Sequence, residues 1–105
     1  MHRELVSIII PTYNRASLLS RAIKSVINQT YSNWEALIIA DNCTDDTSKV
    51  LDVYREDSKI QITELAENVG GAKARNIGLR KARGEYISFL DDDDEWNPEK
   101  IYDQI

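Results

Sequence analysis

The sequence predicts an α/β fold in which a mainly parallel sheet is flanked by helices. Short apolar runs rich in branched and aromatic residues recur along the 105 residues, and most of them barely alternate with polar residues. Such runs are typical of strands buried on both faces of a parallel sheet. The segments between them carry apolar residues at helical spacing, as the crossover connections of a parallel sheet require.

The four expected strands lie at residues 5–10, 36–40, 59–65 and 86–90. The runs "LVSIII", "ALIIA" and "YISFL" are almost entirely apolar, so all three are expected to be buried on both faces. The run "KIQITEL" alternates, which predicts a strand nearer an edge or half exposed.

Four helices are expected between and after these strands. The first starts near Ser17 and has one apolar face, formed by Leu18, Leu19, Ala22, Ile23, Val26 and Ile27. The second is expected to begin at Thr44 as N-cap, with Asp45 and Asp46 in its first turn, and to bury Val50, Leu51 and Tyr54. The third covers about 71–83, ends before Gly84 and places Ala74, Ile77, Gly78 and Ala82 along one side. A last helix follows Pro98.

The strict alternation of strand and helix predicts a Rossmann-like sheet with right-handed crossovers. Ligands of such sheets bind outside the carboxyl ends of the strands. Four polar loops follow the expected strands: "PTYNR", "DNCTDD", "AENVGGAK" and "DDDDEWNP". We expect these loops to converge on one rim of the sheet.

Composition limits the classes of function. The chain is 42% hydrophobic and 30% charged, as expected of one globular domain or part of one. Its net charge of -5 argues against non-specific nucleic-acid binding. The lone Cys43 excludes an internal disulfide framework and a multi-cysteine zinc site. The apolar run near the start is too short to span a membrane and lacks a signal-peptide cleavage pattern, so a cytoplasmic location is expected, with membrane association of a full-length protein left open.

The acidic run at 91–95 requires an explanation. Two carboxylates about 5 Å apart repel by roughly 3 kcal/mol at an effective dielectric near 20, so a tight cluster needs a cation, proton uptake or open water. A solvated acidic turn is one interpretation. The other is a site for Mg²⁺ or Mn²⁺, with Asp91 and Asp93 at DxD spacing. A calcium EF-hand fits poorly, because Trp96 and Tyr102 stand where its glycine and glutamate belong.

The other loops carry weaker indications. In "NVGGAKARN" two glycines precede a helix whose first turns contain Lys73 and Arg75, which suits a phosphate but also suits an ordinary turn. Tyr13 could stack on a flat base or simply pack at the rim. Asp41 could accept a hydrogen bond from a base or a ribose, or cap the following helix.

Taken together, "VSIIIPTYNR", "SVINQTYSNWEALIIADNCTDDT" and "NVGGAKARNIGLRKARGEYISFLDDDDEWNPEK" resemble the inverting, family-2-like glycosyltransferases of the GT-A fold. The resemblance implies a nucleotide-diphosphate sugar as donor, with a UDP-sugar favoured, and Mg²⁺ or Mn²⁺ bridging the diphosphate. It also implies a saccharide or lipid-linked acceptor and inversion at the anomeric carbon.

Carried over by position, the resemblance assigns roles to particular residues. The base pocket would take its floor and stacking wall from Pro11, Thr12 and Tyr13, and Asp41 would read the base. The segment that closes over nucleotide and diphosphate would contain Gly70, Lys73, Arg75 and Asn76. Asp93, with Asp91, would hold the metal, and Asp91 or Asp92 would bind ribose or sugar hydroxyls. The chain departs from the family pattern at three places: Ala40, Asn42-Cys43 and Asp92.

The resemblance places the general base of the reaction beyond residue 105. Residues 1–105 are therefore expected to be the N-terminal, nucleotide-sugar-binding half of a GT-A domain, inactive alone because no catalytic base lies within them. One alternative is a nucleotidyltransferase, although such enzymes usually carry a glycine-rich basic loop where this chain has "PTYNR". The other is a non-catalytic nucleotide-binding or scaffold module.

Overall fold

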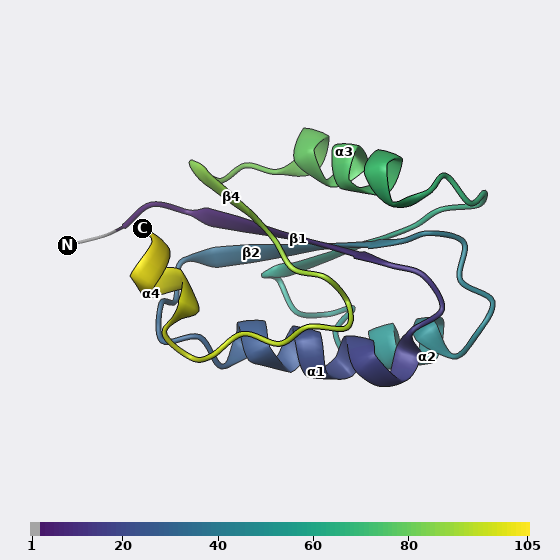
Figure 1. The fold of residues 1–105 in the computed structure, drawn as a ribbon, viewed down its shortest axis with the longest axis horizontal. Helices are drawn as coiled ribbons and strands as arrows, with labels where there is room; N and C mark the ends of the chain where they lie inside the picture. Colours follow the sequence, from purple (N-terminus) through teal and green to yellow (C-terminus); the bar gives the residue numbers. More distant parts are fainter. Residues whose placement is uncertain (1–2) are drawn as a thin grey trace.

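The computed structural model describes residues 3–105, which form one parallel sheet with helices on both faces (Figure 1). The strands are β1 (Val6–Thr12), β2 (Trp34–Ala40), β3 (Ile60–Glu64) and β4 (Tyr86–Phe89). They pair in the order β3-β2-β1-β4, and each of the three pairings is parallel. The expected fold class is confirmed.

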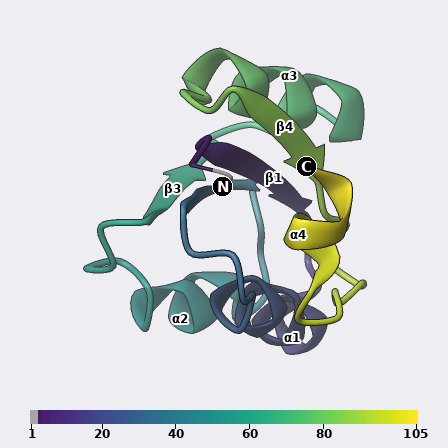
Figure 2. The same cartoon turned by 90° about the vertical axis from the view of Figure 1, so that its left-hand side faces the viewer.

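The helices form two outer layers (Figures 1 and 2). Helices α1 (Ala16–Ile27) and α2 (Thr47–Asp52) cover one face of the sheet, and α3 (Gly71–Lys81) covers the other. The short helix α4 (Lys100–Gln104) lies beside β4 on the α1 side. The chain runs from β1 through β2 to β3 in one direction and then returns to place β4 on the far side of β1. This reversal lies at β1 and β4, where open α/β sheets form their ligand sites.

The two central strands hold the core. Every residue of β2 is buried, and β1 is buried apart from Pro11, as expected for strands covered on both faces. Against one face pack the apolar residues of α1, chiefly Leu19, Ile23 and Val26. Ile27, which the periodicity placed on this face, is 42% exposed, so that assignment is wrong. Ser17 lies inside α1 and does not start it.

Helix α3 lies close to the sheet because Gly78 has no side chain. A Cβ at Gly78 would lie 2.6 Å from Cγ2 of Ile9 on β1. Ala74 and Gly78 are the buried residues of α3, whereas Ile77 is only partly buried. The sheet thereby stays close to the first turns of α3, which border the rim described below.

Helix α2 begins later than the sequence predicts. It starts at Thr47, three residues after the expected cap at Thr44. The carboxylate of Asp45 accepts hydrogen bonds from the Thr47 amide (3.0 Å) and from its hydroxyl (2.5 Å). The Thr47 hydroxyl is the largest cause that holds the pKa of Asp45 below its ordinary value. Asp45 therefore takes the anchoring role that the sequence pattern assigned to Thr44.

Strand β4 differs from the sequence prediction in its environment. It lies at an edge of the sheet, and Tyr86, Ile87 and Phe89 are each about 40% exposed. The apolar run was expected to be buried on both faces, and within this chain it is not. The apolar pattern indicates that a strand is covered, but it does not show which segment covers it. At the opposite edge β3 is half exposed, as predicted.

A buried carboxylate joins three elements at the end of the sheet away from the rim. Glu35 on β2, which is 5% exposed, accepts hydrogen bonds from the Ser7 hydroxyl (2.6 Å), the Arg83 amide (2.8 Å) and the Arg83 guanidinium (3.2 Å). The Gly84 amide donates in turn to the Ser7 hydroxyl (2.8 Å). Burial raises the pKa of Glu35, but these hydrogen bonds outweigh it and leave the pKa below its ordinary value.

Glu35 should therefore make stability depend on pH. Because its folded-state pKa lies below the unfolded value of about 4.3, its stabilisation is present at neutral pH and is lost as pH falls through the folded-state pKa. We expect Glu35→Gln to lower the free energy of unfolding at pH 7 by about 1–2 kcal/mol, and the difference from wild type to shrink below about pH 4. Denaturant melts across this range measure it, with the exposed Glu56→Gln as matched control. A constant difference at every pH would contradict the assignment.

No helix within residues 3–105 is long and apolar enough to cross a membrane.

Candidate functional site

A cavity of about 360 Å³ opens at the carboxyl ends of the strands. Its walls come from the loops after β1, β2 and β4 and from the start of α3. The loop after β3 takes part through Gly71, the first residue of α3, so the convergence expected of the four loops is observed. The residues that line it are Pro11, Thr12, Tyr13, Arg15, Asp41, Gly71, Ala74, Arg75, Asp91, Asp92 and Asp93. The expected residues Pro11, Thr12, Tyr13, Asp41, Arg75 and Asp91–Asp93 are therefore brought together.

Asp92 ties the acidic run to the end of β1. One oxygen of its carboxylate accepts hydrogen bonds from the Thr12 hydroxyl (2.8 Å) and from the Tyr13 amide (3.2 Å). Asp92 is 7% exposed, far less than its acidic neighbours. A buried carboxylate with two such donors is held in place and contributes to the wall of the cavity.

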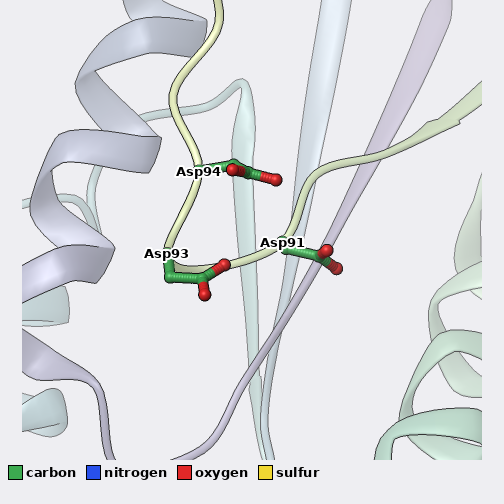
Figure 3. A group of neighbouring side chains, drawn as sticks. All are labelled: Asp91, Asp93 and Asp94. Carbon is green, nitrogen blue, oxygen red and sulfur yellow. The ribbon is translucent and has the colours of Figure 1, made fainter.

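The remaining aspartates face one another. The chain turns after β4, and the Asp94 amide bonds back to the Asp91 carbonyl (3.0 Å). In Figure 3 the side chains of Asp91, Asp93 and Asp94 project to the same side of this loop. One carboxylate oxygen from each lies within 4.8 Å of the others. The turn, and not a continued strand, brings Asp91 and Asp93 together, and it adds Asp94.

Two arginines face this negative charge. An Arg15 terminal nitrogen lies 2.7 Å from an Asp93 oxygen and 3.7 Å from an Asp92 oxygen. Arg75, on the second turn of α3, lies 3.7 Å from Asp91. The Arg15–Asp93 and Arg75–Asp91 pairs are exposed on both sides, so each contributes little to stability. They nevertheless place two cations beside the carboxylates at the mouth of the cavity.

Asp41 joins the loop after β2 to the start of α3. Its two carboxylate oxygens accept hydrogen bonds from the Val69 amide (2.7 Å) and the Gly70 amide (2.9 Å). Gly70 has φ +87°, a conformation that favours glycine. Asp41 is only 4% exposed, yet it lines the cavity. It holds the turn before α3 and does not cap the helix that follows β2, so the capping alternative is wrong.

The loops after β1 and β2 are also joined. The side-chain amide oxygen (Oδ1) of Asn14 accepts hydrogen bonds from the backbone amides of Thr44 (2.8 Å) and Asp45 (3.3 Å). Asp45 in turn accepts from the Ala16 amide at the start of α1 (3.1 Å). Asn14 has φ +50°, which asparagine tolerates better than most residues. These bonds fix the loop that carries Tyr13 and Arg15.

Not every predicted residue reaches the cavity. Lys73 and Asn76 are exposed and do not line it, and Gly70 contributes through its bond to Asp41. Sequence reasoning missed Arg15, Gly71 and Ala74, and it preferred Asp93 and Asp91 to Asp94 within the acidic run. The position of Arg15 directly after "PTYN" was a usable signal, since that loop was expected at the rim. The backbone turn that brings Asp94 close to Asp91 and Asp93 has no comparable signal in the sequence.

Solved structures share this fold. S. aureus TarS 1-349 in complex with UDP-GlcNAc superposes with a TM-score of 0.86 at 33% identity, over 93% of this chain and 29% of that one. A mannosyltransferase, PcManGT from Pyrobaculum calidifontis, in complex with GDP-Man and Mn²⁺, superposes with a TM-score of 0.83 at 30% identity, over 90% and 29% of the two chains. The fold is therefore that of the GT-A glycosyltransferases.

The family follows from the sequence comparisons. Residues 7–105 match the model of glycosyl transferase family 2, and the chain belongs to that family. It is 45% identical over 102 residues to the Escherichia coli UDP-Glc:alpha-D-GlcNAc-diphosphoundecaprenol beta-1,3-glucosyltransferase WfgD, covering 96% of this chain. The chain spans only 40% of the length of WfgD.

Proposed function

We propose that these residues form the donor-binding half of a metal-dependent, inverting glycosyltransferase that uses a nucleotide-diphosphate sugar. The observation that carries the proposal is the cavity itself, which combines an exposed tyrosine, a buried carboxylate, two arginines and two aspartates, Asp91 and Asp93, that lie close to a third, Asp94. These features suit, respectively, a flat base, a hydrogen-bonding base edge or ribose, and a diphosphate with its cation.

The nucleoside would lie between the loops after β1 and β2. The Tyr13 ring is 49% exposed, so a base can stack on it. Asp41 already accepts two amide hydrogen bonds, but two carboxylate oxygens offer about four acceptor sites. It can therefore read the base and hold the turn before α3 at the same time. A UDP-sugar is the favoured donor in this proposal, and the structure of TarS in complex with UDP-GlcNAc supports that choice.

The diphosphate would lie toward Arg75 and the acidic run. The facing oxygens of Asp91, Asp93 and Asp94 are the ligands that Mg²⁺ and Mn²⁺ prefer, so the residues present fit such an ion. Asp93 and Asp91 are its first ligands in this proposal, forming the DxD motif, and Asp94 can complete the set. A bound ion would neutralise the diphosphate and stabilise the charge that develops on it as a leaving group. Arg75 would add positive charge on the α3 side.

The acceptor half of the enzyme would come from further polypeptide. Edge strand β4 exposes Tyr86, Ile87 and Phe89 and offers unpaired backbone groups. A longer chain that adds structure along β4 would cover this surface and supply the general base. That chain would accept a saccharide or a lipid-linked saccharide; WfgD, by its name, acts on a diphosphoundecaprenol-linked sugar.

A thermal-shift panel tests the donor proposal. The chain would be melted with UDP, GDP, dTDP, their sugars and the corresponding nucleoside triphosphates, with and without Mn²⁺, because a ligand that binds the folded state raises the melting temperature. We expect a nucleoside diphosphate or its sugar to stabilise the chain, and Mn²⁺ to increase that shift. Equal or larger shifts with nucleoside triphosphates would favour a nucleotidyltransferase. No shift with any nucleotide would favour a non-catalytic module.

Turnover tests whether the base lies elsewhere. The 105-residue chain is expected to bind the donor without transferring sugar, because no residue within it is assigned as the general base that deprotonates the acceptor. Sugar transfer would be measured as the release of the nucleotide from the donor. Rates from this chain equal to those of a longer chain would contradict the division into a donor half and an acceptor half.

A further inference from the structure

The acidic run already has internal partners for part of its charge. Glu95 pairs with Arg21 of α1 at 2.6 Å, and neither residue lines the cavity. Asp91 faces Arg75 at 3.7 Å, and Asp93 faces Arg15 at 2.7 Å. Among the described residues Asp94 has no ion pair. The closest charged contact of the three facing aspartates is therefore the one between Arg15 and Asp93.

Arg15 is placed so that it can change partners. It lies in the loop between β1 and α1, which the Asn14 and Asp45 hydrogen bonds fix, so its backbone is anchored. Its side chain is 49% exposed, that of Asp93 is 44% exposed, and a single short contact joins them. An exposed pair of this kind is weak and can be replaced at little cost. Arg15 also lines the cavity, so a ligand there is within its reach.

A divalent ion bound by Asp93 would compete with Arg15 for the Asp93 carboxylate. The guanidinium and the ion carry charge of the same sign and would share one carboxylate, so each weakens the hold of the other. A diphosphate offers Arg15 a replacement, because guanidinium groups bind phosphate oxygens through charge-assisted hydrogen bonds. Arg75 faces Asp91 at a longer distance and meets this competition less directly.

From this geometry, and resting on the proposed donor site, we infer that Arg15 is an exchangeable counter-ion of the acidic run. Without ligand it neutralises Asp93; when the ion binds it releases Asp93 and contacts the diphosphate. Arg15 therefore opposes binding of the ion alone and favours binding of the ion together with a nucleoside diphosphate. It acts as a positioning and specificity-determining residue of the donor site.

Two calorimetric titrations of Arg15→Gln test this assignment. Mn²⁺ alone should bind the variant about 3- to 10-fold more tightly than it binds wild type, because the competing cation is gone. UDP titrated in saturating Mn²⁺ should bind about 3- to 10-fold more weakly, because a phosphate contact is lost. Arg15→Lys keeps the charge and should restore the Mn²⁺ affinity to near the wild-type value. Circular dichroism verifies that both variants fold.

Arg21→Gln is the matched control, since it removes the same charge from the other end of the acidic run. It should change both affinities less than twofold. The inference is overturned if Arg15→Gln changes the two affinities in the same direction, or if it behaves like Arg21→Gln while wild type binds both ligands. If wild type binds neither Mn²⁺ nor UDP, the proposed donor site fails and the inference fails with it.

Discussion

Asp93→Asn is expected to weaken Mn²⁺-assisted UDP binding by about 10- to 100-fold while leaving the fold intact. Asp93 offers an oxygen to the facing group of Asp91, Asp93 and Asp94, and an amide is a far poorer ligand for a hard cation than a carboxylate. Asp93 is exposed and no backbone group bonds to its side chain, so stability should change by less than about 0.5 kcal/mol. Calorimetric titration of UDP with and without Mn²⁺ measures the effect.

Glu95→Gln is the control for this substitution. It makes the same chemical change two residues further on, at a carboxylate that pairs with Arg21 and lies outside the facing group. Its UDP affinity in Mn²⁺ should stay within about twofold of wild type. If Asp93→Asn and Glu95→Gln bound UDP with equal affinity in Mn²⁺, Asp93 would not be a metal ligand.

Asp41→Asn is expected to lower both stability and nucleotide affinity. The carboxylate accepts two amide hydrogen bonds, and an asparagine would present an NH₂ group to one of those donors. A buried donor left without an acceptor costs about 1–3 kcal/mol, so the free energy of unfolding should fall by about that amount. The turn before α3 would shift, and UDP affinity should fall by about 10-fold or more. Denaturant melts and calorimetry measure the two effects.

The base selectivity of the Asp41→Asn variant separates its two roles. If Asp41 reads the base, the preference for UDP over GDP should change; if it only holds the Val69–Gly70 turn, both affinities should fall by the same factor. Asp46→Asn in the same loop is the matched control, because Asp46 is exposed and its side chain makes no capping hydrogen bond. A stable Asp41→Asn variant with wild-type UDP affinity would contradict both roles.

The fold could be predicted from the sequence because its central strands are buried on both faces. Runs such as "ALIIA" have no polar face, which is typical of strands in a parallel sheet that is covered on both faces. The exposure of β4 could not be predicted in the same way. Its residues have the composition of a buried strand, and only the strand order shows that one side of β4 lacks a neighbour in this chain.

The site was predictable in its location more than in its contacts. The rule that ligands bind at the carboxyl ends of parallel strands placed Tyr13, Asp41 and Asp91 at one rim. The division of the acidic run could not be read from the sequence, since four consecutive aspartates look alike. The structure separates them by burial: Asp92 is buried and bonds to Thr12, while Asp91, Asp93 and Asp94 are exposed. The position of Asp94 beside Asp91 and Asp93 depends on the hydrogen bond from its amide to the Asp91 carbonyl, which the residue types alone do not predict.

The most direct test is a crystal structure of the chain with Mn²⁺ and UDP, measured at a wavelength that makes manganese visible by anomalous scattering. We expect an anomalous peak between Asp93 and Asp91, with the diphosphate beside it and the base near Tyr13. A rim without manganese or nucleotide at saturating concentrations, with the three aspartates turned into solvent, would contradict the assignment of this rim as the donor site.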